Sequence, residues 1–294
     1  MTSFRKHPLY GPQDFDGIFA TTWALYKKHF SWLFLYSFLF SLVLSLPGIY
    51  LIDMDSLIEL QTTPNLQALS SMTGNLFLYL VTILLGYSLL YLLLHHFIIR
   101  KEEEPWLPAG TLFIESVTKH YLPYLLVMII AGLLFFAGIF LGVFLLVIGS
   151  LLAAVYLGTV FFPVTPALIV EKRDPFATIG RCFSLVHGYF WPTVGQVLVF
   201  MILYLIVSFL LGILASAPYA GNLFQIMSHP EVAGEMISDN RFINMQNPLM
   251  ILLNAAVSGA LLPFIPAFAT TLYFNLRARE DERSPFPERT EEDE

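Results

Sequence analysis

Residues 121–170 read YLPYLLVMIIAGLLFFAGIFLGVFLLVIGSLLAAVYLGTVFFPVTPALIV, and none of these fifty side chains is charged. The core of a membrane is about 30 Å thick, so a helix needs about 20 residues to cross it. A single helix over the whole stretch would reach about 75 Å, which is too long for one crossing. Lys119 and Lys172 flank the stretch, and both are expected on the same side of the membrane. The stretch therefore predicts a helical hairpin, with its turn near Gly142 or Gly149-Ser150.

The composition of the whole chain indicates an integral membrane protein. The chain has 294 residues, of which 56% are hydrophobic and 13% charged, and its mean hydropathy is +0.69. A soluble domain of this length has too little interior for so many apolar side chains. The apolar runs are continuous rather than alternating, which favours helices over barrel strands. Six spans are predicted, at residues 31–52, 76–99, 121–143, 148–170, 191–215 and 248–275.

Positive charge gives the orientation of these spans. Fourteen of the fifteen Lys and Arg residues lie before the first span, in the second or fourth connection, or after the last span, and Arg241 alone lies elsewhere. Because Lys and Arg close to spans remain in the cytoplasm, both termini are predicted to be cytoplasmic. The predicted organisation is an N-terminus with an interfacial helix (1–30), a six-span domain (31–275) and a disordered acidic cytoplasmic tail (276–294).

Three related segments precede the odd-numbered spans. They read WALYKKHFSW (23–32), IESVTKHYLP (114–123) and FSLVHGYFWP (183–192). Apolar residues at helical spacing precede or run through the first and the third of these segments. This spacing predicts amphipathic helices in the cytoplasmic interface. The predicted fold is all-α, with three transmembrane hairpins that each follow an interfacial helix. The candidate residues of this cytoplasmic interface are Trp23, His29, His120, Arg181, Trp191 and Arg277.

Proline pairs occur in two of the even-numbered spans, as PVTPA (163–167) and PFIPA (263–267). Proline removes a backbone donor and kinks a helix, and the carbonyl that it frees needs a partner or a wet cavity. Two interpretations stay open: kinked structural helices, or broken helices that line a cavity for a ligand or lipid. The candidate kink or cavity residues are Pro163, Pro166, Pro263 and Pro266.

Side chains that commonly carry catalysis are sparse or badly placed. No Asp, Glu, Lys or Arg lies in the middle of a predicted span, which argues against a proton- or ion-coupled pump. Six of the seven histidines fall on the predicted inner side, near Glu102, Glu103 and Glu104. His95 and His96 are adjacent, so they diverge by about 100° on a helix and do not chelate together. The sequence predicts no catalytic residue, no cofactor, no metal ligand and no nucleic-acid surface.

The stretch from Pro166 to Trp191 resembles a bacterial family, the membrane domain found attached to some glycerophosphoryl diester phosphodiesterases and also found alone. The matching residues are Glu171, Arg181-Cys182, Leu185, Gly188 and Phe190-Trp191, and the similarity returns in Leu272–Glu280. The chain departs from the family pattern at Cys182, where Ser is usual, and at Asn275, where Asp is usual. The resemblance implies a six-span helical protein of a bacterial inner membrane. It does not imply the diesterase reaction, which belongs to a separate barrel domain that we do not expect after residue 279.

Three functions remain after these observations. The favoured one is a non-enzymatic scaffold or accessory subunit of a membrane complex. The second is a transporter or lipid-handling protein with a cavity between the proline-kinked helices, and the third is an intramembrane enzyme that uses the inner-face histidines. The expected partners are membrane lipids and either a membrane protein or a second copy of the chain.

Overall fold

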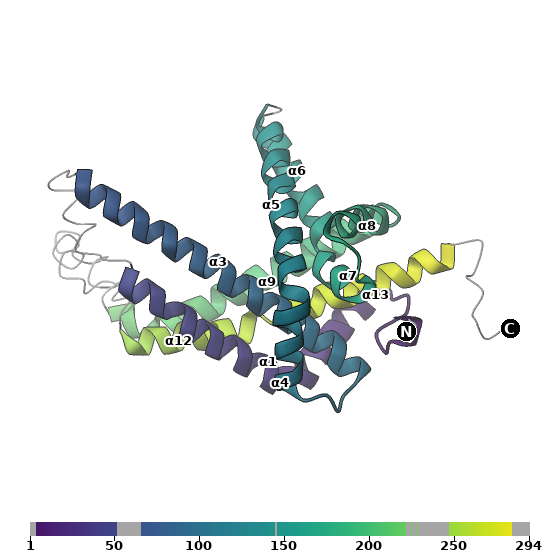
Figure 1. The fold of residues 1–294 in the computed structure, drawn as a ribbon, viewed down its shortest axis with the longest axis horizontal. Helices are drawn as coiled ribbons and strands as arrows, with labels where there is room; N and C mark the ends of the chain where they lie inside the picture. The colour runs from purple at the N-terminus through teal and green to yellow at the C-terminus, as the bar shows by residue number, and fades with distance from the viewer. Residues whose placement is uncertain are drawn as a thin grey trace. The chain divides into compact units, whose positions relative to one another are not determined.

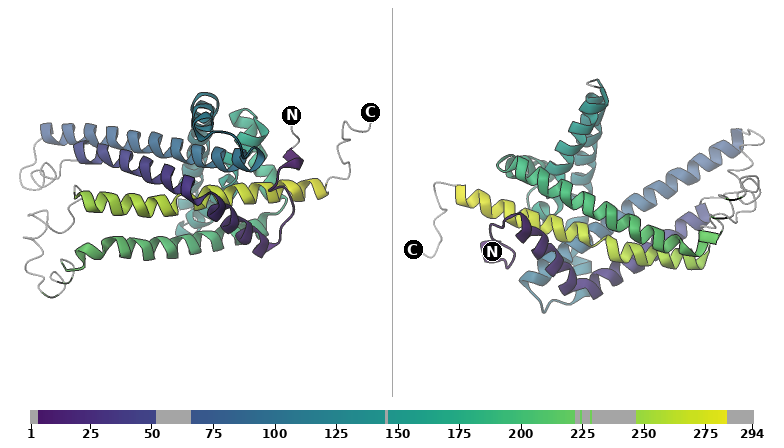
Figure 2. Two further views of the ribbon diagram at one scale, coloured as in Figure 1. Left: turned by 90° about the horizontal axis from the view of Figure 1, so that it is seen from below. Right: turned by 180° about the vertical axis from the view of Figure 1, so that it is seen from behind.

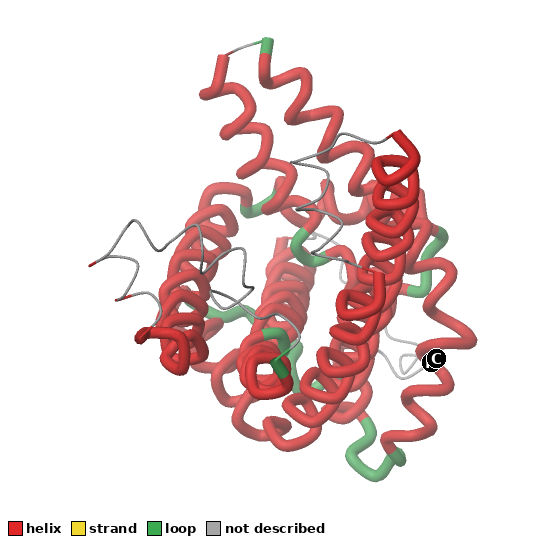
Figure 3. Tube along the Cα trace, turned by 90° about the vertical axis from the view of Figure 1, so that its left-hand side faces the viewer, coloured by secondary structure: helices red, strands yellow, loops and turns green. Residues whose placement is uncertain are grey.

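The computed structural model describes residues 4–51, 66–144, 146–221, 224, 228 and 247–283. These residues form helices and short connections without any strand, as Figure 3 shows by colour. The predicted all-α class is confirmed. The last eleven residues, 284–294, belong to the predicted acidic tail and lie outside the described residues.

Six helical stretches are long and apolar enough to cross a bilayer, and each contains most or all of one predicted span. The protein is therefore a multi-pass membrane protein. Three of the stretches are single helices and three are built from consecutive helices. In chain order these are α1 (Phe15–Leu51), α3 (Leu66–Glu103), α4 (Ala109–Glu115) with α5 (Tyr121–Val143), α6 (Leu146–Phe161) with α7 (Val164–Glu171), α9 (Phe190–Ser216), and α12 (Pro248–Leu261) with α13 (Phe264–Arg283).

Large apolar side chains are exposed along the spans. Phe136 is 73% exposed, Phe209 is 70% exposed and Leu84 is 68% exposed. Many exposed apolar side chains would be costly on a protein in water. They suit helices whose outer faces contact lipid.

The chain divides into two compact units that share the long helices. Unit 2 comprises Ser31–Leu90 and Leu203–Pro263, and it takes its helical segments from α1, α3, α9 and α12, which can be followed by colour in Figure 2. Glycine lets these segments pack closely, since a Cβ at Gly259 would lie 3.0–3.2 Å from the Phe34 and Phe38 side chains. The described part of unit 2 contains no Lys, Arg, Asp or Glu. The described part of unit 2 is therefore packed without ion pairs.

Unit 1 comprises Met1–Phe30, Tyr91–Ile202 and Phe264–Glu294, and it contains the hairpin of α5 and α6. Figure 1 shows these two helices side by side. A Cβ at Gly142 would lie 2.6 Å from backbone atoms of Gly149 and Ser150. The absence of a side chain at Gly142 thus lets the two backbones meet beside the turn, where the sequence predicted it.

Helix α8 (Pro175–His187) is the separate amphipathic helix predicted before the fifth span. Asp174 caps it by accepting a 3.0 Å hydrogen bond from the Ala177 amide, and Pro175 follows at the first helical position. Ile179, Cys182 and Val186 are buried on one face. The helix therefore starts on local signals and packs through a single apolar side.

The other two predicted interfacial helices are continuous with their spans. Residues 18–46 contain neither Gly nor Pro, so nothing ends α1 before it enters the first span. Helix α4 joins α5 through one π-helical turn, Ser116–His120. The first junction has no breaker, and at the second Pro123 stands in the first turn of α5 without ending the helix, so both helices continue.

The predicted tail begins too early. Residues 276–283 form the last two turns of α13 rather than a disordered segment. Three of their charged side chains, Arg277, Glu280 and Asp281, form ion pairs: Arg5 contacts Asp281 at 3.0 Å, and Arg277 and Arg181 both contact Glu280. The high charge density that suggested disorder instead supports a helix, because opposite charges fall at spacings of three and four residues.

Candidate functional site

The two proline pairs interrupt their helices at equivalent positions. Pro163 stands between α6 and α7, and Pro263 stands between α12 and α13. Three residues later, Pro166 and Pro266 are buried within the first turn of the following helix. That position tolerates proline because its N–H has no partner in the same helix.

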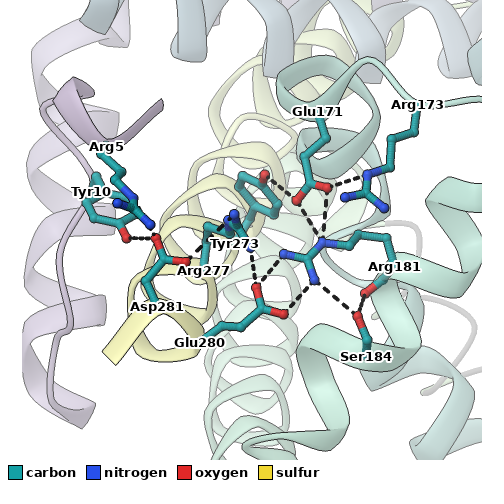
Figure 4. A network of polar contacts seen from close by, with 10 residues as sticks. All are labelled: Arg5, Tyr10, Glu171, Arg173, Arg181, Ser184, Tyr273, Arg277, Glu280 and Asp281. Carbon is teal, nitrogen blue, oxygen red and sulfur yellow. Dashed lines mark hydrogen bonds and ion pairs between the residues drawn. The ribbon is translucent and has the colours of Figure 1, made fainter. Parts of the chain in front are cut away.

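A buried ion cluster centres on Arg181 of α8, with Glu171 at the end of α7 and Glu280 of α13 on either side (Figure 4). Arg181 Nε lies 3.0 Å from both carboxylate oxygens of Glu171, and its two terminal nitrogens contact the two oxygens of Glu280. The Arg181 side chain is 8% exposed and that of Glu171 is 10% exposed. The cluster therefore joins three helices of unit 1 through bidentate contacts.

Neighbouring hydroxyl groups complete this cluster. Tyr273 donates a 3.0 Å hydrogen bond to Glu171, and Arg181 donates a 3.2 Å hydrogen bond to Ser184. Burial alone would lower the pKa of Arg181, but the hydrogen bonds that it donates to Glu280 and Glu171 raise the pKa above its ordinary value. The guanidinium thus stays charged at any accessible pH, and its role is structural.

Cys182 follows Arg181 and is fully buried. Burial raises the pKa of its thiol to about 12. The thiolate needed for nucleophilic or metal chemistry is therefore scarce near neutral pH. The residue packs as a small apolar side chain.

A second ion cluster holds the N-terminal segment against α13. Asp281 accepts hydrogen bonds from Arg5 and from the Tyr10 hydroxyl, and Arg277 lies 3.7 Å away (Figure 4). Burial and the bond to Asp281 raise the pKa of Tyr10 to about 12. Residues far apart in the sequence are therefore joined at one end of α13.

Asn275 of α13 is a buried hydrogen-bond acceptor. Its Oδ1 accepts a 2.7 Å hydrogen bond from the Gln13 amide and a 3.2 Å bond from Arg279 Nε. Asn275 is 1% exposed, and an amide oxygen accepts both bonds without a buried charge. Asn275 therefore joins α13 to the N-terminal segment without a buried charge.

The remaining candidates for the cytoplasmic interface differ in their surroundings. Trp23 is 49% exposed and stacks on Tyr26 and Phe264, whereas Trp191 is 78% exposed. His29 bonds to Glu102 at 2.6 Å. The two tryptophans present aromatic surface, while His29 is held by its hydrogen bond to Glu102.

A polar cavity of about 210 Å³ lies within unit 1. Its lining comes from the N-terminal segment, α3, the α4–α5 helix, the end of α7 and α13. The polar residues include His7, His96, Arg100, Glu115, His120 and Lys172. None of the four candidate prolines lines this cavity, although Glu171 of the Arg181 cluster does.

Burial lowers the pKa of His7, one of the cavity residues. Its Nδ1 accepts a hydrogen bond from the Leu9 amide, so its Nε2 carries the proton and donates to the Ile99 carbonyl, 3.1 Å away. The imidazole also stacks on Phe274 with 4.2 Å between the ring centroids. His7 is thus a neutral structural side chain of the cavity wall.

Three residues of the cavity wall can hold a metal ion. The ligand atoms of His96, Glu115 and His120 all lie within 4.8 Å of one another. The structure thus brings together His120, which the sequence placed at the interface, and two residues that were not selected.

Sequence reasoning missed Glu171, Glu280 and Glu115 as parts of these clusters. Glu280 had a local signal, because it follows Arg277 at helical spacing. Glu171 reaches Arg181 only because the chain turns between α7 and α8, with Lys172 in the left-handed conformation at φ 49°. That contact had no periodic signature in the sequence.

Comparisons with protein-family models, with curated proteins and with solved structures each found no match to this chain.

Proposed function

We propose that this membrane protein is a non-enzymatic scaffold or accessory subunit of a complex in a bacterial inner membrane, with both termini in the cytoplasm. Within this proposal it belongs to the membrane domain family of the bacterial glycerophosphoryl diester phosphodiesterases. Its partners are membrane lipids and a membrane protein or a second copy of the chain, and nucleic acid is not among them.

The observation that carries this proposal is the pairing of charged side chains with one another in unit 1. Arg181, Glu171 and Glu280 are paired with one another, and Asp281 is paired with Arg5. Charges that are saturated inside a protein hold helices together and are poorly available to a passing substrate. The aromatic side chains of Phe176 and Trp191, which are 74% and 78% exposed, remain outside for lipid or protein contact.

Native mass spectrometry tests this proposal on protein extracted gently from its source membrane without overexpression. The expected result is a complex in which this chain has a fixed stoichiometry with another membrane protein or with itself. A lone chain that retains one defined solute would contradict the scaffold function.

A transporter or lipid-handling protein is the second candidate. The interruptions at Pro163 and Pro263 favour it, because broken helices leave backbone carbonyls for a ligand. Reconstitution in vesicles tests this alternative by comparing the wild type with the Pro163→Ala/Pro263→Ala variant. Uptake or lipid transfer that depends on these prolines supports it, and transport that survives the substitutions argues against their role.

A further inference from the structure

His96, Glu115 and His120 form the one group in the described part of the chain that has three potential metal ligands close together. His96 is 1% exposed and comes from α3, whereas Glu115 and His120 stand at the two sides of the α4–α5 junction. The His96 and His120 rings are 5.0 Å apart between centroids. All three residues line the 210 Å³ cavity, so a bound ion would have access to its interior.

The π-helical turn at Ser116–His120 places Glu115 and His120 together. In a regular α-helix, residues five apart diverge by about 140° and cannot share a ligand. A π-turn closes its hydrogen bonds over five residues instead of four and brings such positions onto one side. Isolated π-turns inside α-helices are frequent at functional sites, and this one lies between two potential ligands.

Ser116 favours one tautomer of His96. The Ser116 hydroxyl donates its only proton to the Leu112 carbonyl, 2.8 Å away. It must therefore accept in its 2.6 Å contact with His96 Nδ1, which makes Nδ1 the protonated ring nitrogen. The lone pair of His96 then lies on Nε2. A hydrogen bond to the second ring nitrogen is the usual support of a metal-binding histidine.

The geometry points to a Zn²⁺ site with His96, Glu115 and His120 as the protein ligands. Two imidazoles and one carboxylate are a ligand set that zinc accepts, with the fourth position left to water. Bonds of about 2.0–2.1 Å in a tetrahedron separate the ligand atoms by about 3.3 Å. Side-chain rotation must therefore shorten separations of up to 4.8 Å. This inference departs from the sequence prediction of no metal ligand, and it does not depend on the scaffold proposal.

The positive side chains near the site repel a bound metal ion less strongly than their number suggests. Arg100 is committed to Glu103 and Glu104, at 2.8 Å and 3.2 Å. Lys119 contacts only one oxygen of Glu115, at 3.1 Å, and its side chain is 68% exposed. The Lys172 ammonium is the remaining cation of the lining, and Glu171 beside it lines the same cavity. Lys119 is thus the cation that competes directly with a metal ion for the Glu115 carboxylate.

The test is a Zn²⁺ titration of the full chain in lipid nanodiscs, purified without a polyhistidine tag and freed of metal by a chelator. The expected result is one saturable site per chain, which is lost in Glu115→Gln and in His120→Gln. Ser116→Ala should weaken binding by about 10–100-fold, because Ser116 only positions His96. His187→Gln is the matched control, since His187 is exposed and bonded to Tyr156, and it should bind as the wild type does.

Two further measurements separate a ligand set from a folding defect. Co²⁺ in place of Zn²⁺ should give the visible absorption of a tetrahedral ion, which Glu115→Gln abolishes while the circular dichroism of the helices is unchanged. Lys119→Ala should tighten Zn²⁺ binding by up to about fivefold, because it frees Glu115 from an exposed ion pair. Absence of saturable Zn²⁺ binding by the folded wild type would overturn the inference. Binding that survives the Glu115→Gln/His120→Gln double substitution would overturn it equally.

Discussion

Units 1 and 2 share four long helical stretches, but the packing inside each unit is stabilised by different forces. Within the described ranges, every acidic and basic side chain belongs to unit 1, where the Arg181 and Asp281 clusters join α7, α8, α13 and the N-terminal segment. Unit 2 relies on apolar contacts such as those at Gly86 and Gly259. The difference indicates that packing without ion pairs suffices for the span segments of unit 2, whereas unit 1 also uses precise polar pairing.

Loss of Arg181 should have the largest effect on stability. Arg181→Met leaves the buried carboxylate of Glu171 without its main partner and removes one of the two arginines that contact the part-exposed Glu280, and we expect a loss of about 3–5 kcal/mol. Denaturant titration in mixed micelles measures the free energy of unfolding. Arg173→Ala is the matched control, because Arg173 contacts the same Glu171 but its side chain is 49% exposed. The control should lose at most about 1 kcal/mol, and equal losses in the two variants would contradict the cluster's role.

Gly142→Ala should have the next largest effect. Its Cβ would meet the backbone of α6, which cannot rotate away as a side chain can. The expected loss is about 1–3 kcal/mol in the same titration. Gly132→Ala serves as control in the same helix, since no atom lies within 4 Å of its Cβ position. That control should gain about 0.5–1 kcal/mol from helix propensity, and the reverse order would refute the close packing of the hairpin.

The pH dependence of unit 1 should reflect His7. Burial lowers the pKa of His7 below its ordinary value of 6.5, despite the opposing hydrogen bond to Ile99. The unfolded chain therefore takes up this proton first, and stability falls as the pH drops below 6.5, by up to about 1.4 kcal/mol per pH unit from this residue. Unfolding titrations from pH 7.5 to pH 5 should show a shallower decline for His7→Gln. Identical slopes for the two proteins would exclude this contribution.

Serine substitutions should give effects of opposite sign in the two units. Ser37 of unit 2 is fully buried and its hydroxyl has no hydrogen-bond partner, so Ser37→Ala should leave stability unchanged or raise it by up to about 1 kcal/mol. Ser116 of unit 1 is equally buried but bonds to His96 and Leu112. Ser116→Ala should lose about 1–3 kcal/mol. Thermal unfolding of both variants compares the two changes in stability. A destabilised Ser37→Ala would contradict the expected difference between the two units.

The sequence predicted the membrane class, the six spans and the hairpin over residues 121–170, because length, hydropathy and the positions of Lys and Arg are properties of continuous segments. It did not predict that α1 and the α4–α5 helix continue without a break, since interfacial and transmembrane residues share the same helical period. The end of α13 was assigned to a disordered tail because its charges were counted without their partners.

The candidate sites were harder to predict from the sequence than the fold. Arg181 was selected as an interface residue, but its partners lie ten and ninety-nine residues away. The Glu115–His120 pair depends on a π-helical turn, whereas chelating pairs on a regular α-helix are recognised at a spacing of four residues. Such contacts arise from tertiary structure and from one irregular turn, and no periodic pattern marks either of them.

Hydrogen–deuterium exchange of the wild type and Arg181→Met in lipid nanodiscs tests most directly whether the Arg181 cluster holds unit 1 together. The account predicts faster exchange in α7, in α8 and in the Leu272–Arg283 part of α13, with no change in α12 of unit 2. Arg173→Ala should leave all of these segments unchanged. Exchange that rises equally in both units, or in neither, would contradict the claim that buried charge stabilises unit 1 alone.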